Sequence, residues 1–219
     1  MITSRRRLIG AMAVGATALG LPRNLTSERA LAQVADPRPL DLGATALGQN
    51  RFREVLLPQV RAALDRHSAV VTRRDIAGLV DFSAPSRAAR FYLLDMEEGQ
   101  VISTHLVAHG KGSDPANSGW VERFSNRPGS FASSEGSFMT SQTYVGEHGR
   151  SRRLIGLEPQ NDMAEPRAIV IHGAAYVDPN MAVSQGRVGR SQGCFAVSRR
   201  EIDDVLELLG EGRLLFAAK

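Results

Sequence analysis

Residues 168–173 read Ala-Ile-Val-Ile-His-Gly. The first four form a short and entirely apolar segment, and a histidine follows them directly. A short apolar run bounded by polar sequence is typical of a buried β-strand. We therefore expect a strand over residues 168–171 that ends on His172. Gly173 follows, and a glycine at this point lets the backbone approach a bound molecule closely.

The second decisive segment, residues 189–194, reads Gly-Arg-Ser-Gln-Gly-Cys and delivers Cys194, the only cysteine in the chain. A lone cysteine cannot form a disulfide within its own chain, so it is an inert buried thiol, a link to another chain or a reactive thiol. The polar turn that precedes Cys194 favours the reactive alternative. Gly193 lets the backbone of this turn point N–H groups toward a substrate.

The two segments together predict cysteine-dependent acyl transfer. A thiol attacks only as the thiolate, and a neighbouring imidazole such as His172 can take its proton. The histidine needs a third group to orient it. Since no acidic residue lies near His172 in the sequence, we expect a backbone carbonyl, such as that of Gly173, in this role. The N–H groups of Gly193 and Cys194 are the candidate oxyanion donors.

Each feature alone has an ordinary structural explanation. A histidine at a strand end is usually a satisfied polar residue, and cysteine is often buried and inert. The joint pattern of a strand, His172, a polar loop and then Cys194 is what favours catalysis.

This pattern resembles the L,D-transpeptidases, and most closely the murein L,D-transpeptidase subfamily whose cysteine motif lacks a second histidine. Cys194 follows His172 by 22 residues, within Ser191–Cys194. The resemblance covers about residues 80–200. Further blocks that look like this subfamily are residues 107–113, 124–126, 129–130, 133–134, 144–146, 154–158 and 167–176.

The resemblance implies a β-rich catalytic domain that acts on peptidoglycan stem peptides in the cell envelope. Cys194 would attack the carbonyl between the third stem residue and D-alanine, form a thioester and release D-alanine. An amine on a second stem would then accept the acyl group to give a 3→3 cross-link, whereas water would make the enzyme an L,D-carboxypeptidase. No metal and no cofactor is implied.

Two positions depart from the common family motif. Gln192 stands where a histidine is usual, which leaves His172 as the sole candidate base near Cys194. Ala196 stands where a polar residue is often found, two positions after the cysteine, so the recognition of substrate carboxylates is expected to differ.

Several further residues are candidates for the substrate groove, with structural alternatives. His109 either contacts substrate or makes a structural hydrogen bond in a glycine-rich turn, and tyrosines often pack with only the hydroxyl in water. The remaining histidines, His67, His105 and His148, lack metal-ligand spacing and are interpreted as surface or structural residues. The substrate-binding candidates are His109, Tyr144, Tyr176, Ser191 and Gln192, with Ser125 and Asn126 as weaker additions.

The rest of the sequence predicts a mainly β, β-rich α+β domain, built as a curved sheet or sandwich with peripheral helices. Apolar spacing indicates a helix over 58–67, and Ser198 with Glu201 is a capping-box signature for a helix that ends at Gly210. The glycine- and serine-rich segment 109–137 is a candidate functional loop. The other expected strands are 91–94, 101–107, 137–145 and 213–217.

The N-terminus resembles an export signal. Residues 5–7 are arginines, an apolar run follows from Leu8 to Leu21, and Ala30–Ala32 fits a cleavage site. The paired arginines also suit a twin-arginine signal, while an uncleaved membrane anchor is the alternative. We expect a signal over 1–32, a linker over 33–50, a catalytic domain over 51–219 and a periplasmic location with no stable membrane span.

Without the signal, basic and acidic side chains balance, so the sequence pI of about 9.8 gives little support for nucleic-acid binding. A wall-binding module without catalysis and an exported cysteine hydrolase with another substrate are the competing hypotheses. We expect a monomer.

Overall fold

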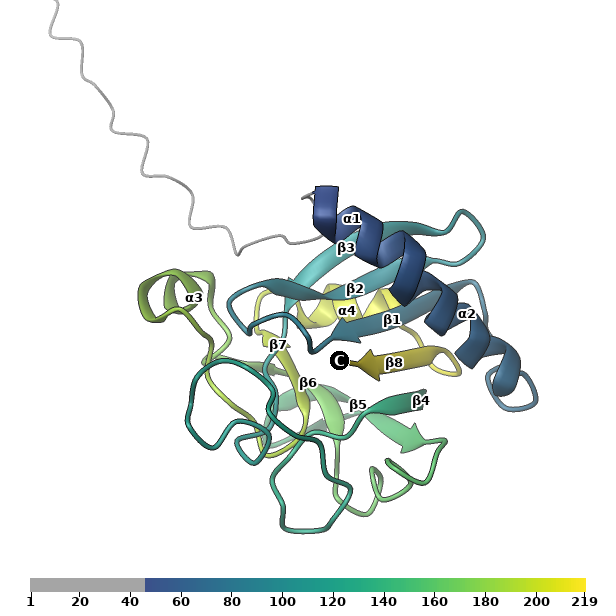
Figure 1. The fold of residues 1–219 in the computed structure, drawn as a ribbon. Helices are drawn as coiled ribbons and strands as arrows, with labels where there is room; N and C mark the ends of the chain where they lie inside the picture. The colour runs from purple at the N-terminus through teal and green to yellow at the C-terminus, as the bar shows by residue number, and fades with distance from the viewer. Residues whose placement is uncertain (1–45) are drawn as a thin grey trace, which may run out of the picture. The chain divides into compact units, whose positions relative to one another are not determined.

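The computed structural model describes residues 46–219, so the expected signal and most of the expected linker lie outside the described residues. Eight strands form one mixed sheet in the order β3-β2-β1-β8-β4-β5-β6-β7 (Figure 1). The strands are β1 Ile76–Asp81, β2 Ala89–Asp95, β3 Gln100–Leu106, β4 Gly136–Gly146, β5 Gly149–Gly156, β6 Val170–Ala174, β7 Phe195–Ser198 and β8 Leu214–Ala218.

The sheet curls so far that its two edges meet. Neighbouring strands are antiparallel except for the pairs β1–β8 and β6–β7, which are parallel. Ala108, just after β3, forms an antiparallel bridge with Ala196 of β7, and its N–H donates to the Ala196 carbonyl at 2.8 Å. The mainly β class and the curved sheet are confirmed, and the described strands belong to one sheet instead of a sandwich of two.

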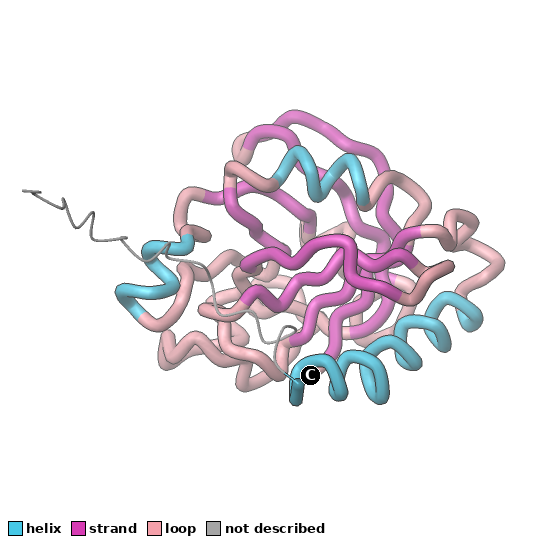
Figure 2. The backbone as a smooth tube through the Cα atoms, turned by 90° about the horizontal axis from the view of Figure 1, so that it is seen from above, coloured by secondary structure: helices cyan, strands magenta, loops and turns pink. Residues whose placement is uncertain are grey.

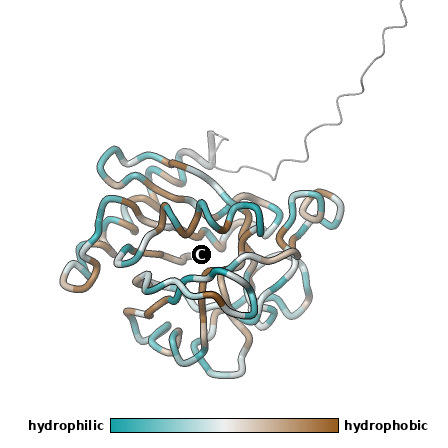
Figure 3. Tube along the Cα trace, turned by 180° about the vertical axis from the view of Figure 1, so that it is seen from behind, coloured by the Kyte–Doolittle hydropathy of each residue, from teal (hydrophilic) through white to brown (hydrophobic). Residues whose placement is uncertain are grey.

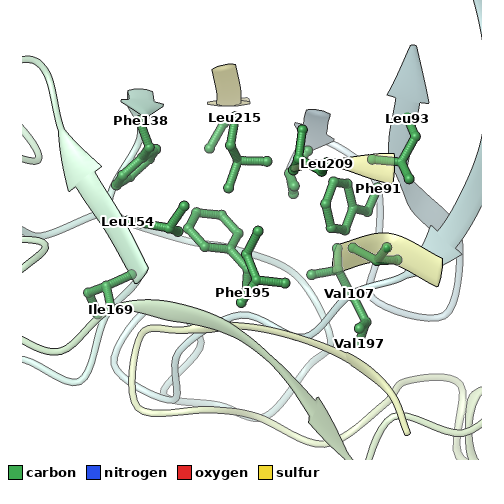
Figure 4. Packing of buried hydrophobic residues seen from close by; sticks show 14 of the residues in the cluster. Phe91, Leu93, Val107, Phe138, Leu154, Ile169, Phe195, Val197, Leu209 and Leu215 are labelled. Carbon is green, nitrogen blue, oxygen red and sulfur yellow. The ribbon is translucent and has the colours of Figure 1, made fainter. Parts of the chain in front are cut away.

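The concave side of this sheet holds the main hydrophobic core. Phe138, Leu154 and Phe195 are fully buried there, and the rings of Phe138 and Phe195 meet edge to face at 5.4 Å (Figure 4). Helix α4, Ile202–Leu208, packs its apolar residues Val205 and Leu206 into the same core. Figure 3 shows how apolar and polar residues follow one another along the chain.

The convex side of β1, β2 and β8 is covered by the N-terminal helices. The segment runs without a break through α1 Ala46–Arg51, the π-helical turn Phe52–Leu56 and α2 Leu57–Arg66, and it lies along one side of the sheet (Figure 2). Successive strand residues therefore serve different cores: Val80 faces the concave core, whereas Leu79 contacts the helical layer. These strands are buried on both faces.

The predicted helix over 58–67 is present as α2, with Pro58 in its first turn as expected. Three local expectations need correction. Helix α1 occupies the end of the expected linker. The expected capping box does not form, since the N-cap Glu201 makes no side-chain cap hydrogen bond. His172 lies inside β6, because β7 pairs with the strand as far as Ala174.

The elements that the sequence did not predict are α1, the π-helical turn, β1, β5, β7 and helix α3, Pro179–Gln185. The expected hairpin, the strands near residues 136–146 and 214–218, and the helix near residues 202–208 are present, with bounds that differ by a few residues.

We expect Phe138→Ala to lower the free energy of unfolding by about 3–5 kcal/mol, because the truncation leaves a cavity in the concave core. Val145→Ala on the same strand is the matched control, since its side chain is 82% exposed. We expect the control to change stability by less than about 0.5 kcal/mol. Urea unfolding measures both, and similar losses in the two variants would contradict the assignment of the core.

Candidate active site

Cys194 is held by a tight turn at the start of β7. The hydroxyl of Ser191 accepts the Gly193 N–H at 3.1 Å and donates to the Cys194 carbonyl at 2.7 Å, so it closes the turn from within. Gly193 has φ +120°, and a Cβ there would lie 2.8 Å from the Ala132 carbonyl oxygen. Only glycine fits this position, so the turn fixes where the thiol emerges.

His172 lies on the strand next to the Cys194 turn. In the parallel β6–β7 ladder His172 pairs with Ala196, and Cys194 lies two residues before Ala196, in the turn that leads into β7. The sulfur of Cys194 contacts the Ala168 carbonyl oxygen at 3.6 Å, just before the strand that carries His172. The ladder therefore brings together the two residues that the sequence singled out.

The imidazole of His172 is buried, with 2% exposure, and its orientation is fixed on both sides. Nδ1 lies 3.1 Å from the Gly173 carbonyl oxygen, which can only accept, so Nδ1 carries the proton and Nε2 is left as an acceptor. The ring of His148 stacks on that of His172 at 4.3 Å with an interplanar angle of 23°. The carbonyl contact expected from the sequence is thus present.

The surroundings of His172 keep it neutral. Burial lowers the pKa of His172; the Gly173 carbonyl acts in the opposite direction, and the charge of His148 lowers it further. A neutral imidazole with a free Nε2 is the form that can take a proton from a thiol.

The thiol of Cys194 is partly exposed and contacts the Ala168 carbonyl oxygen at 3.6 Å. Burial raises the pKa of Cys194, while the Val170 amide, the Arg167 guanidinium and its own amide lower it. The raised pKa means that the thiol needs a base in order to react at neutral pH.

Arg167 is a residue of the site that the sequence did not single out. Its Nη1 donates to the Ser125 carbonyl at 2.8 Å and to the Ser134 hydroxyl at 2.7 Å, and its Nη2 donates to the Ala132 carbonyl at 2.5 Å. These contacts hold the guanidinium beside the Cys194 turn, where an ideal Gly193 Cβ would lie 3.3 Å from Nη2. Arg167 begins the block 167–176 of the family resemblance, but nothing in the sequence places it beside Cys194, and only the fold shows this proximity.

Gly193 is not available as an oxyanion donor in this structure, because its N–H is donated to the Ser191 hydroxyl. The amides of Val170 and Cys194 are the ones that act on the sulfur. Ser191 was expected to bind substrate, but its side chain serves the turn in this structure. Its side chain is buried, and its hydroxyl is occupied on both sides by the turn.

His109 does not line a groove. It is fully buried, and its ring nitrogens face Arg90 at 2.8 Å and Asp114 at 3.3 Å. Burial lowers the pKa of His109 to about 4, with the charge of Arg90 acting in the same direction. The structural alternative for His109 is therefore correct, and the network ties the start of the long loop to β2.

The remaining candidates stay near the site or at its surface. Tyr144 pairs with Ser151, which pairs with His172, so all three share one face of the sheet. The Arg153 guanidinium covers the Tyr144 ring at 4.5 Å. Burial and the nearby Cys194 charge raise the pKa of Tyr176 to about 12. Gln192 is exposed at the turn, so its role in substrate binding stays a prediction.

His148 lies at the surface, as the sequence suggested, since it is exposed at the β4–β5 turn. Its ring also contacts the candidate base, which the sequence did not indicate. Within residues 46–219, no group of three or more histidine, cysteine or acidic residues is arranged to hold a metal ion. No helix in this described part is both long and apolar enough to cross a membrane.

The sequence matches the family described as the L,D-transpeptidase catalytic domain over residues 52–218, and the chain belongs to this family. The comparison with curated proteins gives no match.

Solved structures that resemble this chain include an L,D-transpeptidase from Mycobacterium smegmatis, with 14% identity over 66% of this chain and 59% of that chain and a TM-score of 0.41. Another, from Xylanimonas cellulosilytica, has 17% identity over 74% of this chain and 70% of that chain, with a TM-score of 0.40. The helical cell shape determining protein Pgp2 from Campylobacter jejuni has 9% identity over 66% of this chain and 47% of that chain, with a TM-score of 0.44. The matched region is thus less than two thirds of the Mycobacterium smegmatis chain.

We expect Arg167→Met to slow alkylation of Cys194 by iodoacetamide and to shift its pH profile upward, because a positive charge that favours the thiolate is lost. Arg53→Met, an exposed position on the N-terminal helix, is the control. A circular dichroism melt checks that the variant is folded. An unchanged alkylation profile in a folded variant would show that Arg167 only braces the loop.

We expect His148→Phe to raise the pKa of His172, because phenylalanine keeps a ring in the stack but removes the charge that opposes protonation. The acid limb of any His172-dependent rate would then move to higher pH. Titration of the histidine signals by NMR measures the shift, with Glu147→Gln on the same turn as control. A fall in the pKa of His172, or no change, would contradict the assignment.

Proposed function

We propose that this chain is an exported L,D-transpeptidase that transfers acyl groups between peptidoglycan stem peptides through a thioester on Cys194. The observation that carries the proposal is the state of His172: neutral, fixed through Nδ1 by the Gly173 carbonyl, and on the strand beside the turn that holds the thiol. Membership of the L,D-transpeptidase catalytic domain family supports the substrate class.

In the proposed first half-reaction, the Cys194 thiol gives its proton to His172 Nε2 as sulfur attacks the carbonyl carbon of the amide before D-alanine. The tetrahedral oxyanion forms near the amides of Val170 and Cys194, which already act on the sulfur. The C–N bond then breaks, His172 returns the proton to the leaving amine, and a thioester remains.

In the second half-reaction, an amine of a second stem attacks the thioester carbonyl and gives its proton to His172, and the thiolate leaves and is reprotonated. The product of amine attack is the 3→3 cross-link. Water would give L,D-carboxypeptidase activity by the same steps. Sulfur is a good leaving group, so the acceptor that reaches the thioester decides between the two products.

The positive charge beside the sulfur supports catalysis over a wall-binding module. Ala196 is buried beside the bridge to Ala108 and carries no charge. Arg167, held beside the Cys194 turn by its bond to the Ala132 carbonyl, supplies a positive charge that lowers the pKa of the thiol. A cation that favours the thiolate suits a nucleophilic cysteine.

Export to the periplasm is the second part of the proposal. It rests on the arginine-rich start, the apolar run and the small-residue cleavage site of residues 1–32. An envelope enzyme would find its peptidoglycan substrate there.

We expect the purified parent protein to gain the mass of a carbapenem, whereas Cys194→Ala gains none, because the drug acylates only an activated thiol in an acyl-transfer site. His172→Gln should slow acylation by roughly 10²–10⁴-fold, the usual contribution of a general base. Intact mass spectrometry with time resolution measures both effects. Products from a stem tetrapeptide then distinguish the cross-linked dimer from the tripeptide released by water.

The binding-module hypothesis makes the opposite forecast. The parent would form no adduct, its thiol would resist small alkylating agents, and Cys194→Ala would bind cell walls as the parent does. A hydrolase with another substrate would form the adduct but leave stem tetrapeptides intact.

A further inference from the structure

A polar pocket of about 420 Å³ lies within the long loop between β3 and β4. Two arginines, Arg123 and Arg127, line it together with the hydroxyl-bearing residues Ser125 and Ser130. No acidic side chain belongs to its lining. The pocket therefore presents positive charge and hydrogen-bond donors to whatever enters it.

The backbone around this pocket is well fixed. Residues 127–130 form a β-turn in which the Ser130 N–H donates to the Arg127 carbonyl at 3.2 Å. Pro128 and Gly129, with φ +74° at the glycine, are the central residues that a type II turn prefers. The Arg127 N–H donates to the Ser125 hydroxyl at 3.2 Å. The turn thus presents Arg127 from a rigid support.

Arg123 is fixed from the other side of the loop, where its Nε donates to the Gly112 carbonyl at 3.0 Å. In the part of the chain that the structure describes, neither Arg123 nor Arg127 forms an ion pair, whereas Arg51, Arg150 and Arg213 each contact an aspartate. Two exposed guanidinium groups on one pocket, both without a carboxylate, match the needs of an anion.

The same loop connects this pocket to the candidate active site. Ser130 and Ala132 line the pocket, and both also accept hydrogen bonds from Arg167, beside the thiol. The Ala132 carbonyl faces Gly193 of the Cys194 turn. A peptide bound at Cys194 would therefore lie close enough to extend a side branch or a chain end toward the two arginines.

We propose that this pocket binds a carboxylate of the peptide substrate through Arg123 and Arg127, and so selects acidic peptides over amidated ones. The inference rests on the proposed function, because it takes a peptide at Cys194 as the substrate. Arginine binds a carboxylate through two parallel N–H···O contacts, which gives selectivity for the charged group over a neutral carboxamide.

The test compares two synthetic stem tetrapeptides that both keep the free carboxylate of the terminal D-alanine. One peptide also has free carboxylates elsewhere, and the other has carboxamides at those positions. Binding is measured by calorimetry on Cys194→Ala, which cannot turn the peptide over. We expect this protein to bind the acidic peptide more tightly, and the added double substitution Arg123→Gln and Arg127→Gln to weaken that binding on the order of tenfold. Binding of the amidated peptide should not change.

Arg127→Gln alone keeps the Arg123 contact with Gly112 and should lose part of the preference, which separates charge recognition from a damaged loop. Arg53→Gln is the matched control, since it removes an exposed arginine from the N-terminal helix. Equal affinity for the two peptides in Cys194→Ala, or an equal loss for both in the arginine variants, would overturn the inference.

The failure of this inference and the failure of the proposed function give different results. If the parent forms the carbapenem adduct but does not discriminate between the peptides, the function stands and the pocket has no role in selection. If the peptides are discriminated through the arginines but no adduct forms on the parent, the pocket is assigned and the acyl-transfer proposal fails.

Discussion

The parallel ladder between β6 and β7 is the constraint on which the candidate site depends. Ile171 pairs with Phe195, and both belong to the concave core, so the next residue of β6, His172, points to the opposite face. The turn before Phe195 places Cys194 beside this strand, where its sulfur contacts the Ala168 carbonyl oxygen. A slip of one residue would turn His172 into the core and expose Ile171. The same burial that stabilises the fold therefore fixes the position of the candidate base.

Three segments then shape the environment of the thiol around this ladder. The β4–β5 turn brings His148 against His172, and the turn before β6 carries Arg167. The long loop contacts the Cys194 turn through Ser133, whose hydroxyl donates to the Gly193 carbonyl at 3.2 Å. The loop itself is anchored by the buried contact between Arg90 and His109. A buried cation is costly unless its donors are satisfied, and Arg90 meets this need with carbonyls of Ala84 and Val107 as well.

The sequence was informative where one local pattern had one physical explanation. The apolar run before His172 indicated a strand, and the glycine next to Cys194 indicated a turn with unusual backbone geometry. Helix α3 could also have been found, since Asp178 caps it, Pro179 begins it and Gly186 ends it with a positive φ. By contrast, β1 and β7 are short strands whose pairing depends on distant partners, and no local period distinguishes them from a buried loop.

The site residues that the sequence missed share one property: each acts through a contact with a segment that is distant along the chain. Arg167 lies 27 residues before Cys194, and His148 lies 24 residues before His172. His109 shows the converse, because its glycine-rich surroundings suggested a substrate loop, whereas the same glycines allow the close packing that buries it. A Cβ at Gly110 would lie 2.3 Å from the Phe131 carbonyl oxygen. Glycine in this loop thus marks a close contact between two backbone segments. The sequence alone does not distinguish such a contact from a close approach of the backbone to substrate.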